Sequence, residues 1–338
     1  MNRRNFLSFS TSSVAIALGA GSSVIKVNFC HGGDMERESA KMLNPNTKWL
    51  REAKWGVFTH YLPHTPGEEI PGHMTGKMWN KKVNSFKVSE LGDQLEALNA
   101  PYFFITLGQK ADYYCSPNSS FEKLFGPSKG TLTERDLVAE LAADLIPRGI
   151  RMCVYLPALG HGDSVEMQAM YQQVITEWSE RWGESISAWW IDEGVFPSPE
   201  MYKAYTNAFK AGNKDALIAY NNNKVVLGRR QATSAADPGD YYAGQRTWSL
   251  PVSSVRPFDK LKFYMPENQL HFLTFTGTSW GTGNPRFPDN LLIGWVKHTN
   301  NYRGTISLDV PLTDSGIIPE KHFRQMTVLS KKINNKTH

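Results

Sequence analysis

The sequence predicts a single-domain α/β protein, a (β/α)8 TIM barrel over residues 50–330. Two observations predict this fold. Eight apolar runs of strand length recur along the chain, and most are followed by a stretch with helical periodicity. The runs are mostly continuous rather than alternating, which is typical of parallel strands buried on both faces. Eight alternating units predict closure of the sheet into a barrel of about 250 residues.

The predicted strands are short and spread over the whole domain. They begin near Trp55 (WGVFTHY), Tyr102 (YFFITLG), Arg151 (RMCVYLPA), Ser187 (SAWWIDE), Leu217 (LIAYNNN), Asp240 (DYYAGQ), Leu270 (LHFLTFTG) and Thr305 (TISLDVP). Residues 88–98, 165–182 and 288–298 are amphipathic and predict helices. Another helix is expected over residues 137–149, because Thr133 and Asp136 stand before it in capping-box spacing. Residues 223–236 and 245–269 are expected to be loops.

The first 30 residues predict an export signal. Arg3-Arg4 followed by Phe6-Leu7 forms a twin-arginine pattern, and a short apolar stretch follows it. An ordinary signal peptide that begins with two arginines stays open, and both interpretations predict a periplasmic or secreted protein. Residues 31–49 are expected to form an N-terminal segment and residues 331–338 a C-terminal tail. No later apolar run has the length that an integral membrane segment needs.

Charge and motifs argue against several partners and cofactors. The chain has 37 Lys and Arg against 32 Asp and Glu, and no long basic run, so nucleic acid is not the expected partner. No glycine-rich phosphate loop follows a strand, and His60 and His64 have no matching carboxylate cluster. We therefore expect no metal and no cofactor. These patterns do not determine the oligomeric state.

Three cysteines occur in the chain, at positions 30, 115 and 153. The residues before Cys30 fit a lipoprotein cleavage site poorly, so no lipid anchor is expected. Cys115 and Cys153 follow or lie on neighbouring predicted strands. They either pair or remain two buried thiols, and their spacing does not decide between these alternatives.

In a (β/α)8 barrel the functional residues lie at the carboxyl ends of the strands. Polar and aromatic side chains stand at or after most of the predicted strand ends, where they would converge on one mouth. The candidates for contact with a substrate are His60, Tyr61, Gln109, Lys110, Tyr113, Trp190, Asn221, Gln245, His271 and Trp280.

Asp192 is the predicted catalytic carboxylate. It ends an apolar run, where desolvation would be costly unless the group faced the open end of the barrel. A retaining glycosidase uses one carboxylate to attack the anomeric carbon and a second, about 5 Å away, to protonate the leaving oxygen. The candidates for the second are Glu193, Asp240 and Glu69. Glu193 can act with Asp192 only if the strand ends at Asp192 and the chain turns, since neighbours on a strand face opposite sides. A salt-bridged, structural Asp192 is the alternative.

The strand ends after residue 50 resemble the α-L-fucosidase family of glycoside hydrolases. Residues 54–61 (KWGVFTHY) look like the first-strand motif of that family, and residues 190–192 (WID) stand where the family has W-F-D. Residues 86–106, 135–141 and 149–155 fit its next helices and strands. Residues 279–281 (SWG) and 308–319 fit its last third. The resemblance implies retaining hydrolysis with Asp192 as nucleophile, and His60 and Trp280 as sugar contacts.

The sequence departs from the family at several strand ends. The family's K-H-H-D-G-F stretch is residues 108–113 here (GQKADY), without a histidine. Glu193 replaces a glycine after the nucleophile, and His271 replaces a glutamate. Near the expected acid/base glutamate the chain has Gln245, beside Asp240. Lys110 puts a cation where the family has imidazoles, which favours an anionic group such as a sulfate or a uronate.

The predicted function is that of a secreted, α-L-fucosidase-like glycoside hydrolase. It would hydrolyse, with retention, a glycosidic bond of a deoxy or an acidic or sulfated sugar, and its partner is an oligo- or polysaccharide. The alternative is a catalytically lapsed barrel that binds glycans, because the family's histidines are missing and Gln245 stands near the expected acid. An aldolase-type barrel would need a buried lysine at a strand end, for which Lys110 alone could serve.

Overall fold

A computed structural model of the 338-residue chain describes residues 44–63, 74–109, 113–126, 131–158, 164–194, 196–221, 239–246 and 268–334. Eight parallel strands of the described chain form one sheet in the order β7-β6-β5-β2-β1-β10-β9-β8. They are β1 (Trp55–Thr59), β2 (Tyr102–Thr106), β5 (Arg151–Pro157), β6 (Ile186–Asp192), β7 (Leu217–Tyr220), β8 (Gln245–Arg246), β9 (His271–Phe275) and β10 (Thr305–Asp309). Each predicted run supplies one of these strands, and the predicted α/β barrel is confirmed.

The two ends of this sheet order meet, because the segment before β8 hydrogen-bonds to β7. The backbone N–H of Asp240 donates to the Ile218 carbonyl at 2.7 Å, and the Ile218 N–H donates to the Asp240 carboxylate at 2.9 Å. Tyr241 forms a bridge with Gln269, just before β9. The sixth predicted run therefore begins as a single bridge and becomes a regular strand only at β8. It joins β7 to β9 and closes the barrel.

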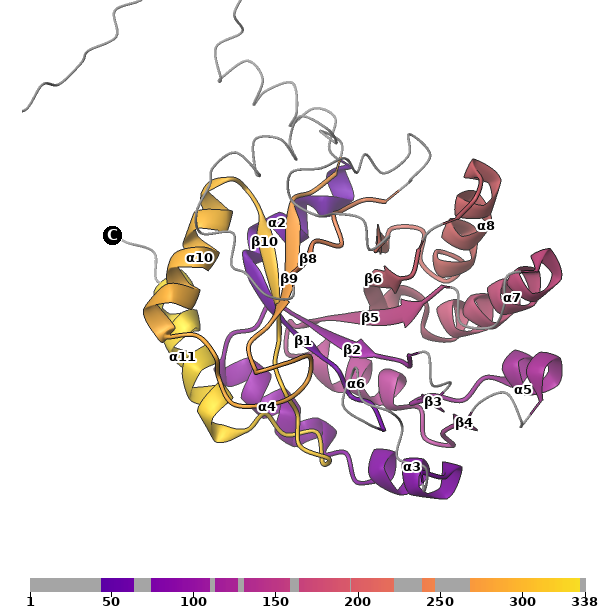
Figure 1. Ribbon diagram of the computed structural model, residues 1–338, viewed down its shortest axis with the longest axis horizontal. Helices are drawn as coiled ribbons and strands as arrows, with labels where there is room; N and C mark the ends of the chain where they lie inside the picture. Colours follow the sequence, from indigo (N-terminus) through magenta and orange to yellow (C-terminus); the bar gives the residue numbers. More distant parts are fainter. Residues whose placement is uncertain are drawn as a thin grey trace, which may run out of the picture. The chain divides into compact units, whose positions relative to one another are not determined.

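Helices run along the outside of the sheet, with α4, α10 and α11 on one side and α7 and α8 on the other (Figure 1). Their bounds are α2 (Lys48–Ala53), α3 (Gly76–Asn84), α4 (Val88–Ala97), α5 (Ser119–Phe125), α6 (Leu137–Leu145), α7 (Val165–Trp182), α8 (Pro199–Phe209), α10 (Asp289–Asn301) and α11 (Glu320–Asn334). Two 3-10 turns, η1 (Pro45–Thr47) and η2 (Gly183–Ser185), and a small pair of strands, β3 (Tyr113–Tyr114) and β4 (Thr131–Leu132), complete the described elements.

The N-terminus of α6 differs from the sequence prediction. Its N-cap is Asp136, whose carboxylate accepts from the Ala139 N–H at 3.0 Å. Thr133 does not cap this helix, because its hydroxyl donates to the Arg135 carbonyl instead. Asp136 is a strong N-cap by itself, so the capping box that the spacing suggested is not needed. The predicted loop at residues 223–236 lies outside the described residues, as do residues 247–267 of the predicted loop 245–269. The first two residues of that second loop form β8 instead, and Gln269 forms a bridge with Tyr241.

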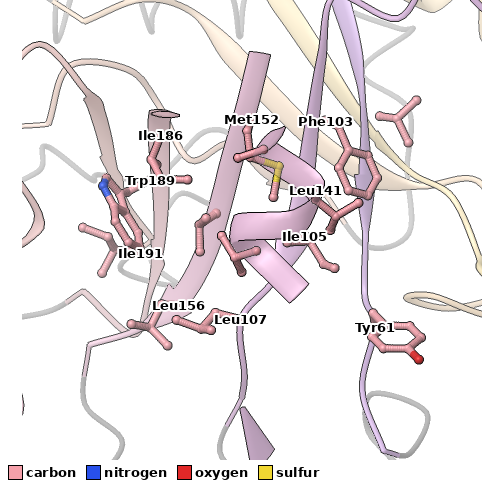
Figure 2. Packing of buried hydrophobic residues seen from close by; sticks show 14 of the residues in the cluster. Tyr61, Phe103, Ile105, Leu107, Leu141, Met152, Leu156, Ile186, Trp189 and Ile191 are labelled. Carbon is pink, nitrogen blue, oxygen red and sulfur yellow. The ribbon is translucent and has the colours of Figure 1, made fainter. Parts of the chain in front are cut away.

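Alternation along the strands divides the side chains between two cores. The outer core lies between the sheet and the helices. Figure 2 shows part of it, with Phe103 and Ile105 of β2 and Met152 of β5 near Leu141 of α6. Because both faces of each strand are covered, the strands read as continuous apolar runs in the sequence.

The inner core fills the barrel and is largely aromatic, and its members include Phe58, Tyr102, Phe104, Tyr155 and Trp190. Cys153 belongs to this inner core, whereas Cys115 belongs to the outer core. The two cysteines are therefore separate buried thiols rather than a disulfide.

The segment before β1 covers the end of the barrel where the strands begin. Leu50 and Ala53 of α2 belong to the inner core, and Trp49 packs edge-on against Tyr102 at 5.8 Å between ring centroids. The Leu50 carbonyl accepts from the hydroxyl of Thr305, the first residue of β10. The opposite end, where the strands finish, carries the polar side chains.

Candidate active site

The last inward-facing side chain of each strand lines the mouth of the barrel, because residues two apart on a strand share a face. Trp190 lies in the inner core, so Asp192 is the next inward residue of β6. Asn221 and Gln245 likewise stand two residues beyond an inner-core alanine. The strand period thus brings together three of the residues predicted from the sequence.

Asp192 ends β6, and its carboxylate accepts three hydrogen bonds. The Tyr155 hydroxyl donates to Oδ2 at 2.5 Å, and the Asn221 amide nitrogen donates to Oδ1 at 2.8 Å. The Glu193 backbone N–H donates to Oδ1 at 3.0 Å. In the described part of the chain its side-chain partners are a hydroxyl and an amide, not a lysine or an arginine. These donors hold both oxygens in a fixed orientation at the mouth.

Tyr155 connects Asp192 to two other predicted residues. Burial raises the pKa of the Tyr155 hydroxyl, and the negative charge of Asp192 raises it further, so the hydroxyl stays a neutral donor. The Gln109 amide nitrogen donates to the Tyr155 oxygen at 3.1 Å. The Tyr155 ring stacks on Trp190, with centroids 5.2 Å apart. Gln109 therefore acts on Asp192 through Tyr155. Trp190, predicted as a sugar contact, is instead buried in the inner core, and its indole N–H donates to the Ala243 carbonyl.

Asn221 joins Asp192 to Gln245, because its amide nitrogen also donates to Gln245 Oε1 at 2.5 Å. Gly244 allows Gln245 to reach this place. Its φ is +63°, and a Cβ there would lie 2.1 Å from the backbone oxygen of His271. Only glycine permits so close an approach to β9 in this conformation.

His60 and Trp280 form another part of the mouth, and Asp309 contacts His60 and Gly281, the residue after Trp280. His60 Nδ1 and backbone nitrogen lie 3.0 and 3.2 Å from Asp309 Oδ1, and the Gly281 N–H donates to Oδ2 at 2.6 Å. Asp309 is 0% exposed. The ring centroid of His60 lies 5.3 Å from that of Trp280 and 5.6 Å from that of Tyr155.

Glu193 meets the condition under which it could work with Asp192. The strand ends at Asp192, and Glu193 has a φ of +53°, so the chain turns there. The Gly194 N–H then donates to the Asn221 carbonyl at 3.0 Å. The Glu193 charge contributes to the raised pKa of Tyr155, after burial and the charge of Asp192.

The structure does not bring Asp240 to this group. Its carboxylate accepts from Lys210 Nζ at 2.9 Å, from Asn44 at 2.7 Å and from the Ile218 N–H. Ile218 pairs with Trp189, three residues before the end of β6. Side chains alternate along the segment, and Tyr241 belongs to the inner core, so Asp240 points outward to Lys210 at the end of α8. It is therefore not a partner for Asp192.

His271 also lies away from the mouth, which corrects its prediction as a sugar contact. It is the first residue of β9, fully buried, with Nδ1 2.8 Å from the Tyr242 carbonyl and Nε2 2.8 Å from the Ser307 hydroxyl. Burial lowers its pKa from 6.5 to about 4. A strand's first residue lies at the amino end of the barrel, opposite the mouth. The prediction was wrong because it treated a residue at the start of the strand as one at its carboxyl end.

Tyr61 and Tyr113 were predicted as contacts, but their hydroxyls are used elsewhere. Tyr61 is buried in the outer core and donates to the carbonyls of Lys82 and Asp314. Tyr113 lies on β3, outside the barrel, and donates to the Met74 carbonyl at 3.2 Å. The predicted contact Lys110 and the candidate acid Glu69 lie outside the described residues.

Two residues of the mouth were missed from the sequence. Tyr155 looks like one more apolar residue of a buried strand, and Asp309 follows the apolar run of the last predicted strand. Asp309 stands after Leu308 as Asp192 stands after Ile191, so the signal that identified Asp192 also identifies Asp309. Tyr155 has no such signal, because its role depends on contact with the next strand.

The described residues contain no cluster of three His, Cys, Asp or Glu side chains that could hold a metal ion. No helix among these residues is long and apolar enough to cross a membrane.

No family model and no curated protein matches the sequence. Solved structures do match. An endo-fucoidan hydrolase of glycoside hydrolase family 107 superposes with a TM-score of 0.66 at 16% identity, over 85% of this chain and 53% of that one. An α-L-fucosidase of family 29 from Bacteroides thetaiotaomicron superposes with a TM-score of 0.62 at 14% identity, over 86% and 74%. A family 29 fucosidase of the same organism, trapped as a covalent intermediate in a glutamate-to-glutamine mutant, gives the same TM-score.

These neighbours are glycoside hydrolases, and the chain shares their barrel fold. It spans about half the length of the family 107 enzyme and about three quarters of the family 29 enzyme. At such low identity the likeness shows the barrel fold alone, and the chemistry depends on the residues at the mouth.

Proposed function

We propose that the chain is a retaining glycoside hydrolase in which Asp192 is the nucleophile. The observation that carries the proposal is the placement of this carboxylate at the mouth, with Tyr155 and Asn221 each holding one oxygen. Catalytic groups of (β/α)8 barrels stand at this end of the strands. Glycoside hydrolases with the same fold support the reaction class, and one of them forms a covalent intermediate, as a nucleophilic mechanism requires.

In the first proposed step an Asp192 oxygen attacks the anomeric carbon, and the bond from that carbon to the leaving oxygen breaks. The bond's electron pair goes to the leaving oxygen. Because the two donors already hold the carboxylate, the attack needs no reorientation of the nucleophile. The rings of Trp280 and His60 supply a wall of the kind that packs against a sugar face.

The proposed substrate is fucose-like, a deoxy sugar or an acidic or sulfated one, in an oligo- or polysaccharide. Lys110 is the feature that favours an anionic sugar. We expect Lys110→Ala to weaken the binding of sulfated sugars more than that of neutral ones, as measured by calorimetry. Equal losses on both would contradict this preference. Export to the periplasm or beyond, directed by the twin-arginine pattern, is part of the proposal.

The nucleophile is tested with Asp192→Asn and Asp192→Ala in the mature protein. We expect turnover of aryl α-L-fucosides to fall on the order of a thousandfold or more, with the far-UV circular dichroism unchanged. A 2-fluoro-fucosyl fluoride should add one sugar to a wild-type peptide that contains Asp192, as detected by mass spectrometry. A variant that keeps its activity, or an adduct on another residue, would refute the assignment. Loss of folding would instead indicate a structural carboxylate.

A second candidate function is glycan binding without hydrolysis. The observation that favours it is that the hydrogen bonds around Asp192 lead to amides rather than to a second carboxylate. Tyr155 accepts from Gln109, and Asn221 donates to Gln245. In that case fucosylated or sulfated glycans would bind to the wild type and to Asp192→Asn equally well. Neither protein would release reducing sugar or form a covalent adduct.

A further inference from the structure

Gln245 and Asp192 are held by one common donor. The Asn221 amide nitrogen donates to Asp192 Oδ1 at 2.8 Å and to Gln245 Oε1 at 2.5 Å. The two acceptor oxygens are therefore no further apart than the sum of these distances, about 5.3 Å. In a retaining glycosidase the two carboxyl groups are about 5–5.5 Å apart. Residue 245 thus lies within the distance from Asp192 at which a retaining glycosidase places its second carboxyl group.

The backbone fixes residue 245 at this place. β8 pairs with β9 in the register Gln245 to Leu273, and the Leu273 N–H donates to the Gly244 carbonyl at 3.1 Å. Ala243, two residues earlier, belongs to the inner core, so the side chain of Gln245 points to the same interior. A glutamate at this position would therefore face Asp192 without any change of register.

An amide cannot do the work of a carboxylic acid at this position. Near neutral pH it neither gives a proton to a leaving oxygen nor takes one from water, both of which a general acid/base must do. Among the described residues, Glu193 and Asp309 are the other carboxylates of the mouth. The Asp309 oxygens accept from the Gly281 N–H and lie against His60. Glu193 contacts Asp192 through its backbone N–H and is its neighbour on the same strand end. It stands beside Asp192 rather than across from it.

We propose that Gln245 occupies the acid/base position of this site. The natural amide slows the cleavage of glycosides with a poor leaving group, those of oligo- and polysaccharides included, and slows the release of the glycosyl-enzyme. This inference rests on the proposed role of Asp192. A dinitrophenyl leaving group departs as the phenolate with the electron pair of the broken bond and needs no proton. Water then attacks the anomeric carbon, the bond from that carbon to Asp192 breaks, the carboxylate regains its electron pair, and the proton goes to solvent.

The experiment compares the wild type with Gln245→Glu on 2,4-dinitrophenyl and methyl α-L-fucosides, which differ only in the leaving group. The wild type should release a burst of dinitrophenolate from the aryl fucoside and should turn over almost no methyl fucoside. Mass spectrometry should find one fucosyl group added to the peptide that contains Asp192. Gln245→Glu should raise the steady rate on the order of a hundredfold, abolish the adduct, and give a bell-shaped pH profile. Gln173→Glu, the same change on the exposed face of α7, should behave as the wild type.

A second measurement needs no variant. Azide attacks a glycosyl-enzyme without a general base, so it should raise the wild-type steady rate and yield fucosyl azide. An Asp192 adduct together with equal rates for the wild type and Gln245→Glu, and no effect of azide, would overturn the inference alone. Absence of any adduct and of any turnover in both proteins would overturn the proposed function, and this inference with it.

Discussion

At the scale of single residues, Tyr155 is the connection between the inner core and the proposed chemistry. Its ring belongs to the packed interior and its hydroxyl donates to Asp192. We expect Tyr155→Phe to keep the fold and to lower kcat/KM by on the order of 10- to 100-fold, because a hydrogen bond to a charged group is worth about 1.5–3 kcal/mol. Steady-state kinetics on an aryl fucoside measure this.

Tyr241→Phe is the matched control. It removes another buried hydroxyl, which donates to the Trp189 carbonyl at 2.8 Å and does not contact Asp192. We expect a loss of stability of about 1 kcal/mol and no change in kinetics. An equal drop in activity for both variants would mean that Tyr155 acts only through the general packing of the barrel.

His271 gives the fold a pH dependence of its own. Its folded pKa of about 4 lies below the ordinary value of 6.5, so the folded ring stays neutral where the unfolded ring takes up a proton. The contribution is fully present above pH 6.5 and is lost as the pH falls toward 4, up to about 3 kcal/mol. His322, whose pKa is also lowered by burial, acts in the same direction.

Urea denaturation between pH 7.5 and 4.5 measures this dependence. We expect the free energy of unfolding to fall with pH, and His271→Gln to make the fall less steep without removing it, since His322 remains. NMR titration of the imidazole signals provides a direct check. A His271 ring that titrates near 6.5 in the folded protein would contradict the prediction.

At the scale of elements, β8 shows how one glycine determines a site. Gly244 has a positive φ and touches the backbone of β9, so a side chain there would push Gln245 off its register. We expect Gly244→Ala to lower stability by about 1 kcal/mol or more and to reduce activity as well, measured by urea denaturation and kinetics.

Gly294 in α10 offers the opposite case. A Cβ built there meets nothing within 4 Å, and the residue lies inside a helix. Gly294→Ala should therefore stabilise the protein by about 0.5–1 kcal/mol and leave activity unchanged. If both alanine variants were neutral, the close approach of β8 to β9 would not be what holds Gln245.

At the scale of the whole molecule, the barrel closes through polar contacts of Asp240. Its carboxylate bonds to Lys210 at the end of α8 and to the Ile218 N–H of β7. Most of both side chains is buried, so removing one charge leaves the other without compensation. We expect Lys210→Met to destabilise the fold by about 2 kcal/mol or more, less than for a fully buried pair because the lysine is partly exposed.

A double-mutant cycle with Asp240→Asn separates the ion pair from the other contacts. The double variant should be less destabilised than the sum of the single variants, as measured by urea denaturation. Additive effects would show that Asp240 closes the barrel through its backbone and Asn44 contacts alone.

The sequence by itself determined the barrel architecture and the position of Asp192 at the end of its strand. Buried parallel strands are apolar on both faces, so each unit was visible as a continuous run, and a carboxylate at the end of such a run, as at Asp192, was expected at the open end of the barrel. His60, Gln109, Asn221, Gln245 and Trp280 were predicted as mouth residues for the same reason, and the structure places them there.

Only the tertiary structure decided which polar residues meet. Asp240 and His271 stand at strand starts, and a one-dimensional run does not show which of its ends reaches the mouth. Tyr155 and Asp309 act on residues far away in sequence, and the Asn221 bridge that brings Gln245 close to Asp192 exists only between two neighbouring strands. Local periodicity encodes which face a side chain takes, whereas contacts between strands depend on register and closure, which the chain acquires only when the barrel forms.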